Sequence, residues 1–174
     1  MNRHVLVTYA TKAGSTVEVA NAIGAVLTQR GCTVAVRPIK DHPAPASYEA
    51  VVIGSAIRMG SWLPEALEYV RANQGVLRRL PLAIFTVHFL NTGDDEVSRQ
   101  ARLAYTAPVR QMVTPQAEVF FSGKMDYSRL SFIDGAIARA VQKSTNTRPG
   151  DLRDWNKIRG WAQSLWAEAA SAAA

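Results

Sequence analysis

Short apolar runs alternate with helical patterns along this chain, and the alternation limits its possible folds more than any other feature. Strands are predicted where the sequence is apolar or alternates in polarity, over residues 4–9, 33–37, 50–54, 81–87 and 118–121. Because such strands are too apolar to have one face in water, we expect a parallel sheet with helices on both faces. The pattern predicts an α/β fold with three layers, doubly wound.

The segments between these runs have helical periodicity. The helix after the turn at residues 11–16 carries an apolar face, and further helices are predicted over 62–74, over much of 95–113 and over 130–143. Asp151 is predicted to cap a last helix, whose apolar stripe consists of Trp155, Ile158, Ala162, Leu165 and Ala169.

The size of the chain suits one hydrophobic core. Its 174 residues are 48% hydrophobic, so we expect a single domain over residues 1–174. A single cysteine, Cys32, excludes an internal disulfide, and the sequence opens on a strand without a signal-peptide pattern. The longest apolar stretch, 80–90, is too short to span a bilayer. We expect a cytoplasmic protein.

Positive charge is concentrated in one part of the chain. The net charge is +6, and residues 97–159 contain 11 Lys and Arg against 5 Asp and Glu. The excess is either spread over solvated helix faces or gathered into a basic face for an anionic membrane surface, an acidic protein or a carboxylated substrate. Arg129, Arg139 and Lys143 are the candidates for such a face. Nucleic acid is not expected as a partner, because no zinc, helix-turn-helix or ribonucleoprotein motif accompanies the charge.

The turn at residues 11–16 connects the first strand to the first helix. Free N–H groups and the positive end of the helix dipole favour an anion there, and hydroxyl groups add donors. The alternative is a capping box, in which Ser15 and Glu18 satisfy the helix itself. No nucleoside-triphosphate loop or dinucleotide fingerprint is present. The leading hypothesis is a site for a phosphate-bearing cofactor.

The loops at 10–16, 55–62, 88–95 and 123–129 are expected to converge beyond the carboxyl ends of the strands. Trp62 either stacks on a planar ring or packs in the core. Arg58 either neutralises an anionic group or forms a salt bridge, and His88 either exchanges a proton or is structural. We name Arg58 and His88 as catalytic candidates. Residues 94–96 are predicted to open a helix, and no metal site is expected.

Three segments resemble one family. Residues 10–16, Ala-Thr-Lys-Ala-Gly-Ser-Thr, are similar to the flavodoxin phosphate loop, and residues 52–60 and 150–155 resemble the flavodoxin-domain branch that contains menaquinone-dependent protoporphyrinogen oxidase. The resemblance implies a flavodoxin-like sheet of five parallel strands in the order 2-1-3-4-5, with FMN as cofactor. It places Thr11, Ser15 and Thr16 on phosphate-contacting positions. Together with the expected convergence of the loops, it gives the predicted cofactor contacts: Thr11, Lys12, Ala13, Gly14, Ser15, Thr16, Ser55, Ala56, Ile57, Arg58, Met59, Gly60, Trp62, His88, Phe89 and Leu90.

The same resemblance implies an FMN-dependent oxidoreductase that oxidises protoporphyrinogen IX or a similar substrate and passes electrons to quinone. Such an activity would place the protein at the inner face of the membrane as a peripheral protein. One alternative is an electron-transfer flavoprotein with a protein partner and no small-molecule substrate. The pI of this chain, 9.8, argues against that role with conventional partners, because ordinary flavodoxins are acidic and dock on basic patches. Another alternative is a flavodoxin fold that has lost its cofactor and serves as an interaction module.

Overall fold

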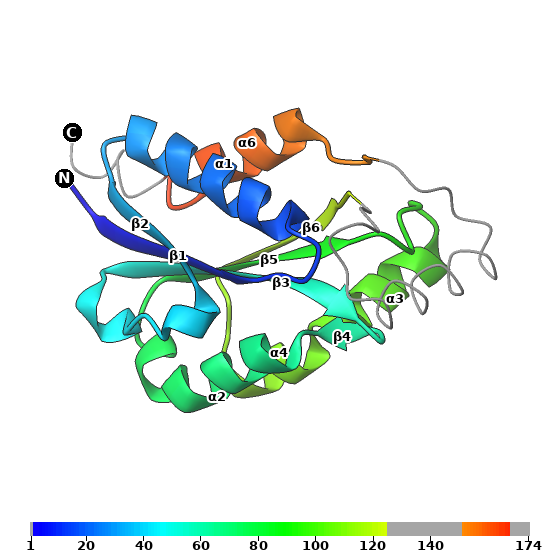
Figure 1. The fold of residues 1–174 in the computed structure, drawn as a ribbon, viewed down its shortest axis with the longest axis horizontal. Coiled ribbons are helices and arrows are strands. Elements are labelled where there is room, and N and C mark those ends of the chain that lie inside the picture. The colour runs from blue at the N-terminus through cyan, green and yellow to red at the C-terminus, as the bar shows by residue number, and fades with distance from the viewer. Residues whose placement is uncertain (1, 125–150, 168–174) are drawn as a thin grey trace.

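A sheet of parallel strands forms the centre of the computed structural model, which describes residues 2–124 and 151–167 (Figure 1). The parallel strands lie in the order β2-β1-β3-β5-β6, and the short strand β4 pairs antiparallel with β3. Their bounds are β1 His4–Ala10, β2 Thr33–Pro38, β3 Ala50–Arg58, β4 Ser61–Trp62, β5 Leu82–His88 and β6 Ala117–Ser122. The predicted doubly wound sheet and its strand order are confirmed, with β4 as an addition.

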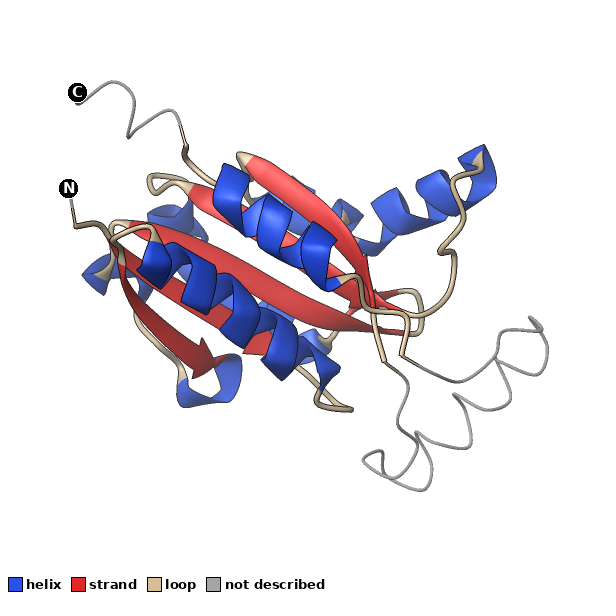
Figure 2. Cartoon of the chain, turned by 90° about the horizontal axis from the view of Figure 1, so that it is seen from above, coloured by secondary structure: helices blue, strands red, loops and turns tan. Residues whose placement is uncertain are grey.

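Helices cover both faces of this sheet. Helices α1 and α6 lie side by side on one face, and α2 and α4 lie on the other (Figures 1 and 2). Helix α3 extends beyond the sheet, at the end where β3 and β5 finish. The bounds are α1 Ser15–Gln29, α2 Pro64–Leu77, α3 Glu96–Tyr105, α4 Ala107–Met112 and α6 Trp155–Ser164, with 3-10 turns η1 Ile39–Asp41 and η2 Pro45–Ser47.

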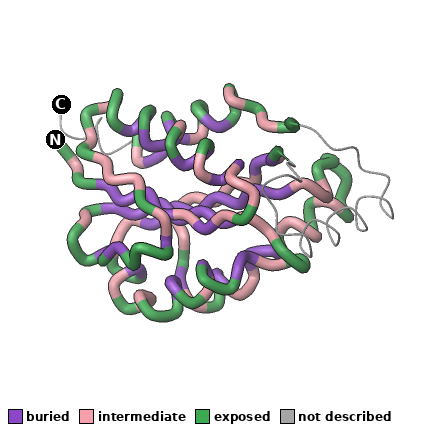
Figure 3. The backbone as a smooth tube through the Cα atoms, in the orientation of Figure 1, coloured by how far each residue is buried: buried purple, intermediate pink, exposed green. Residues whose placement is uncertain are grey.

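Two cores follow from the alternation of side chains along the strands. In β1, Val5 and Val7 face α1 and α6, whereas Leu6 and Ala10 face α2. All four are buried, and Figure 3 shows the buried residues concentrated along the strands and on the inner sides of the helices. A parallel sheet buried on both faces explains why its strands are apolar at successive positions.

Gly54 permits the tightest contact in the core. It lies opposite Phe85 in the β3–β5 pairing, and a Cβ at this position would lie 1.9 Å from Phe85 Cζ. The Phe85 ring therefore crosses over the backbone of β3, where it packs near Phe121 and Trp161. Glycine is needed here for close approach.

Two predicted helix boundaries are wrong. The helix expected over much of 95–113 is divided at Thr106, because Pro108 lacks the N–H that a continuous helix needs and clashes with the preceding turn. The last helix is capped by Asp154, whose side chain accepts a hydrogen bond from Lys157 N at 3.0 Å, and not by Asp151. Asp151 instead pairs with Arg153. The predicted helix 130–143 and Ala169 lie outside the described residues.

Candidate cofactor site

The carboxyl ends of four parallel strands meet at one edge of the sheet. The turn at 11–14 follows β1, a hairpin follows β3, residues 89–95 follow β5, and Gly123 follows β6. A parallel sheet places these ends together, as Figure 1 shows at the end nearest α3. The convergence predicted from the strand pattern is therefore present for these ends, while residues 125–129 of the predicted fourth loop lie outside the described residues.

The turn after β1 is built by backbone geometry. Gly14 has φ 89°, in the left-handed region that favours glycine, and it occupies the N-cap position of α1. Thr11 Oγ1 accepts a hydrogen bond from Gly14 N at 3.0 Å, and no side chain in the described part of the protein caps the helix. The capping box predicted as an alternative is therefore wrong: Ser15 is the first residue of the helix, and Glu18 pairs with Arg153.

Thr16 carries the most informative atom of the site. Its side chain is fully buried in the first turn of α1, and among the described residues Thr16 Oγ1 has no hydrogen-bond partner. A buried hydroxyl without a partner costs about 1–3 kcal/mol, so such a group calls for an explanation. A phosphate at the N-terminus of α1 supplies one, since it accepts hydrogen bonds from hydroxyl and backbone N–H groups together. The residues present fit a phosphate.

The segment after β3 is a hairpin and not the loop predicted at 55–62. Ile57 pairs with Trp62 across a two-residue turn, in which Met59 has φ 54° and Gly60 has φ 75°. Positive φ at both turn positions matches the twist of the two strands. Met59 is 81% exposed at the tip, and Arg58 is exposed at the end of β3. The hairpin presents its backbone at the edge of the sheet.

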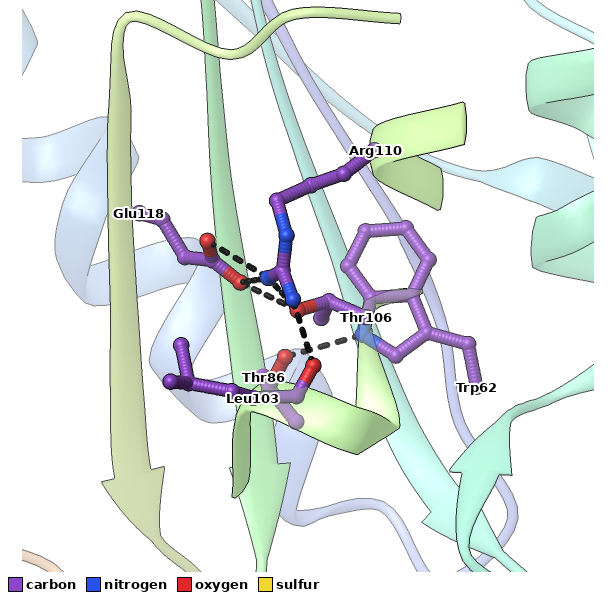
Figure 4. A network of polar contacts seen from close by, with 6 residues as sticks. All are labelled: Trp62, Thr86, Leu103, Thr106, Arg110 and Glu118. Atoms are coloured by element: carbon purple, nitrogen blue, oxygen red, sulfur yellow. Dashed lines mark hydrogen bonds and ion pairs between the residues drawn. The ribbon is translucent and has the colours of Figure 1, made fainter. Parts of the chain in front are cut away.

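Trp62 lies in the core. Its side chain is 1% exposed, and its indole Nε1 donates a hydrogen bond to Thr86 Oγ1 at 2.8 Å (Figure 4). The structure therefore supports the core alternative, because no face of the ring is open for stacking. Ser55 also has a structural role: its Oγ donates to Ala56 O at 2.7 Å and accepts from Leu63 N at 3.1 Å, where α2 begins.

A polar network lies beside the indole of Trp62 (Figure 4). The Arg110 guanidinium donates to both carboxylate oxygens of Glu118 at 3.0 Å and to Leu103 O at 2.6 Å. Thr106 Oγ1, in the break between α3 and α4, donates to Glu118 and accepts from Arg110. These bonds attach the broken helix to β6, so this network is structural.

His88 ends β5 and shapes the residues that follow. Its side chain is 6% exposed, and Nδ1 donates to Leu90 O at 2.7 Å, because a carbonyl oxygen can only accept. Burial, with smaller contributions from the positive charges of Arg102 and Lys157, lowers the pKa of His88 to about 4, although the hydrogen bond to Leu90 opposes this shift. The ring is neutral at pH 7, which does not favour proton exchange near neutrality. We assign it a positioning role.

Side chains also hold the rest of the segment after β5. Arg102 Nη1 donates to the carbonyl oxygens of Asn91 and Gly93, and Asn91 Nδ2 donates to the hydroxyl of Tyr105 at 2.6 Å. The predicted helix start is confirmed: Asp95 caps α3 by accepting a bond from Ser98 N at 2.9 Å. Sequence reasoning missed Arg102 and Asn91, because their partners are backbone atoms that only the folded loop brings within reach.

The flavodoxin-domain family model matches residues 6–150 of the chain. This chain belongs to the flavodoxin-domain family. FMN is the cofactor that this membership assigns, and the unpartnered Thr16 hydroxyl at the N-terminus of α1 fits its phosphate. The family resemblance seen in the sequence and the cofactor predicted from it are confirmed.

Two relatives carry a more specific name, protoporphyrinogen IX dehydrogenase (quinone). The protein from Leishmania major is 27% identical over 171 residues, which cover 92% of this chain and 73% of that protein. The protein from Escherichia coli strain K12 is 23% identical over 168 residues, which cover 92% and 93%. The similarity extends over nearly the whole length of this chain.

Solved structures support the fold. A short-chain flavodoxin associated with a non-canonical PDU bacterial microcompartment superimposes with a TM-score of 0.59 at 16% identity, covering 97% of this chain and 99% of that one. A flavodoxin from Streptococcus pneumoniae TIGR4 gives 0.56 at 12% identity, covering 95% and 99%. Within residues 2–124 and 151–167, no helix is long and apolar enough to cross a membrane.

Proposed function

We propose that this flavoprotein oxidises protoporphyrinogen IX, or a closely similar reduced tetrapyrrole, and passes the electrons to a quinone. The unpartnered, buried Thr16 hydroxyl at the start of α1 carries the cofactor part of the proposal. The substrate and the acceptor are supported by the two relatives named for this reaction, which match over 92% of the chain.

The phosphate of FMN would be held by the turn at 11–16. Backbone N–H groups of the first turn of α1 point toward this position, since the first four N–H groups of a helix lack partners within it. Thr16 would add its hydroxyl, which has no partner among the described residues. Thr11 would add a hydroxyl hydrogen, because within residues 2–124 and 151–167 its oxygen serves only as acceptor for Gly14 N. We also assign Lys12, Ala13 and Ser15 to this turn of the site.

The flavin ring would lie between the β3–β4 hairpin and the segment after β5. We propose that most of the contacts come from backbone groups, at residues 55–60 and 88–90. Arg58 adds a positive charge at the end of β3, which favours an anionic reduced ring or the carboxylates of a tetrapyrrole. Bound FMN supplies the redox chemistry, by accepting electrons from the substrate and passing them to the acceptor.

The test is anaerobic turnover. FMN-loaded protein is mixed with protoporphyrinogen IX and a water-soluble menaquinone analogue, and porphyrin fluorescence is recorded. Porphyrin should form only when both quinone and FMN are present, and the quinone should be reduced to the quinol. If no quinone supports porphyrin formation while a reductase protein exchanges electrons rapidly with the flavin, the electron-carrier function replaces this one. Protein that binds no FMN would instead be an interaction module.

The same assay addresses the membrane partner. Adding anionic or neutral liposomes that contain menaquinone, over a series of salt concentrations, shows whether charge brings the protein to the quinone. An advantage for anionic liposomes that disappears at high salt would support docking at the membrane surface, because exposed charges are screened beyond about 8 Å at physiological ionic strength. Arg129, Arg139 and Lys143, the candidates from the sequence, lie outside the described residues.

A further inference from the structure

Just before α6 the chain returns to the cofactor edge, which is the edge of the sheet where the carboxyl ends of β1, β3, β5 and β6 meet. Asp151 forms a β-bridge with Lys124, which follows β6, and Leu152 N donates to Gly123 O at 3.1 Å. Gly123 N in turn donates to His88 O at 2.7 Å. A Cβ on Gly123 would lie 3.5 Å from Ser15 Oγ. Residues 151–153 are thereby attached to the end of β6, beside the turn at 11–16.

Arg153 joins this returning segment to α1. Its Nε and Nη2 donate to the two carboxylate oxygens of Asp151 at 2.8 and 2.6 Å, and its Nη1 pairs with Glu18 in the first turn of α1. The guanidinium also lies over the ring of Trp155, with 4.7 Å between Cζ and the ring centroid. Only 6% of the Arg153 side chain is exposed, whereas 51% of Glu18 and 42% of Asp151 are. One buried cation therefore serves two carboxylates.

The position of Glu18 makes this pairing consequential. A carboxylate in the first turn of a helix interacts favourably with the dipole when it is alone. A phosphate at the same helix end carries negative charge as well, so an unpaired Glu18 would repel it. Glu18, Arg153 and Asp151 together carry one negative charge, and without the arginine they would carry two.

We infer that Arg153 is a positioning residue for the cofactor phosphate, which acts by neutralising Glu18 at the N-terminus of α1. This inference rests on the FMN site of the proposed function and adds to it a determinant of phosphate binding outside the turn at 11–16. The ion pair also anchors the segment before α6 to α1. The electrostatic role should affect the binding of a phosphorylated flavin only, whereas anchoring should affect the binding of any ligand at this edge.

FMN and riboflavin separate these two roles, because they differ only in the phosphate. Dissociation constants for both are measured by flavin fluorescence on apoprotein of the parent, Arg153→Gln, Glu18→Gln and the double variant. Arg159→Gln is the matched control, since Arg159 is an exposed arginine of α6 that bonds to Asn156. Denaturant unfolding of each apoprotein records whether anchoring is lost.

Arg153→Gln should weaken FMN binding about five- to tenfold, as expected for one additional unpaired charge near a phosphate, and leave riboflavin binding within about twofold. The double variant restores the parent's net charge and should restore FMN binding. Glu18→Gln alone should strengthen FMN binding about threefold, and these differences should shrink as salt rises. Arg159→Gln should change neither flavin.

Equal losses of FMN and riboflavin in Arg153→Gln, or no recovery in the double variant, would overturn the inference and leave Arg153 as an anchor. If Arg153→Gln does not fold, Glu18→Gln decides alone, and an unchanged FMN affinity overturns the inference. If the flavins bind as expected but no porphyrin is formed, only the proposed substrate is contradicted. Parent protein that binds neither flavin would overturn both proposals.

Discussion

The two sides of the cofactor edge are built in different ways. The turn at 11–16 depends on backbone geometry, with Gly14 in the left-handed region and no side chain capping α1. The segment at 89–95 depends on side chains, since His88 and Arg102 supply donors to its carbonyl groups. Among the described residues, the first side leaves the Thr16 hydroxyl without a partner, whereas three carbonyl groups of the second side already accept hydrogen bonds.

This difference indicates a division of labour. Unpartnered donors, such as the Thr16 hydroxyl, would gain a hydrogen bond from a bound anion, so we expect the turn at 11–16 to recognise charge. Carbonyl groups that already accept hydrogen bonds gain less from new polar contacts, so we expect the segment at 89–95 to contribute mainly shape. The β3–β4 hairpin belongs with the second side, because the buried Trp62 holds it in place.

The largest expected effect is a loss of stability at Trp62, in the hairpin that belongs to the side built by side chains. Trp62→Ala should lower the free energy of unfolding by about 3–5 kcal/mol, because it removes a fully buried aromatic ring. Trp62→Phe should lower the same free energy by about 1 kcal/mol, because the hydrogen bond to Thr86 is lost. Denaturant unfolding measures both. Met59→Ala, at the exposed tip of the same hairpin, is the control and should stay within about 0.5 kcal/mol.

If Trp62→Ala were as stable as the control but bound FMN poorly, Trp62 would contact the ring after all. The assignment of the hairpin to the side built by side chains would then be wrong.

The next effect is a dependence of stability on pH. His88 titrates near 6.5 when unfolded and at about 4 when folded, so below pH 6.5 the unfolded chain binds a proton that the folded chain does not. The contribution of neutral His88 to the free energy of unfolding is fully present above pH 6.5. The free energy of unfolding should fall by about 3 kcal/mol between pH 6.5 and 4. Unfolding free energies over this range measure it.

His88→Gln should remove this dependence, whatever its own cost to stability. The pairing with Arg153 lowers the pKa of Asp151 to about 2 from an ordinary value of 3.8, so the loss of its contribution falls mainly below the His88 window. A parent protein as stable at pH 4.5 as at pH 7 would show that the ring is not held neutral.

An intermediate effect is expected at the turn at 11–16. Thr16→Val should weaken FMN binding by about 1.5–3 kcal/mol, because a hydrogen bond to a charged group is lost. The same change should raise the stability of the apoprotein, since it removes a buried hydroxyl without a partner. Fluorescence titration and denaturant unfolding measure the two effects.

Thr8→Val is the matched control, because Thr8 in β1 is also fully buried with an unpartnered hydroxyl. It should raise stability similarly and leave FMN binding unchanged. Equal weakening by both variants, or a loss of riboflavin binding as large as that of FMN, would count against a phosphate at Thr16.

The smallest effect is expected in the segment after β5. Arg102→Gln removes the donor to Asn91 O and Gly93 O and should cost about 1 kcal/mol of stability. The binding of FMN and of riboflavin should weaken equally, because we propose that this side contacts the ring that the two flavins share. Titration of both flavins tests it, with Arg99→Gln as control, since Arg99 forms an exposed pair with Glu96. A change in the ratio of the two affinities would contradict the division of labour.

Much of the fold was predictable because the apolar pattern is a direct record of burial. All five predicted strands are present, and the order of the parallel strands follows the family resemblance. The hairpin was missed, since its turn, Met59-Gly60, lacks the usual Asn or Asp before glycine. The division of the helix at Thr106 could have been predicted from Pro108. Proline is tolerated in the first turn of a helix but not in its interior, so a new helix begins there.

The amino-acid sequence by itself determined the layered sheet, the turn at 11–16 and the family, because these depend on local periodicity and on motifs that are contiguous in the chain. Tertiary structure decided what each side chain does. It buried Trp62 against Thr86, paired Glu18 with Arg153 across 135 positions of sequence, and left the Thr16 hydroxyl without a partner among the described residues. Such pairings depend on distances between elements, which no local pattern records.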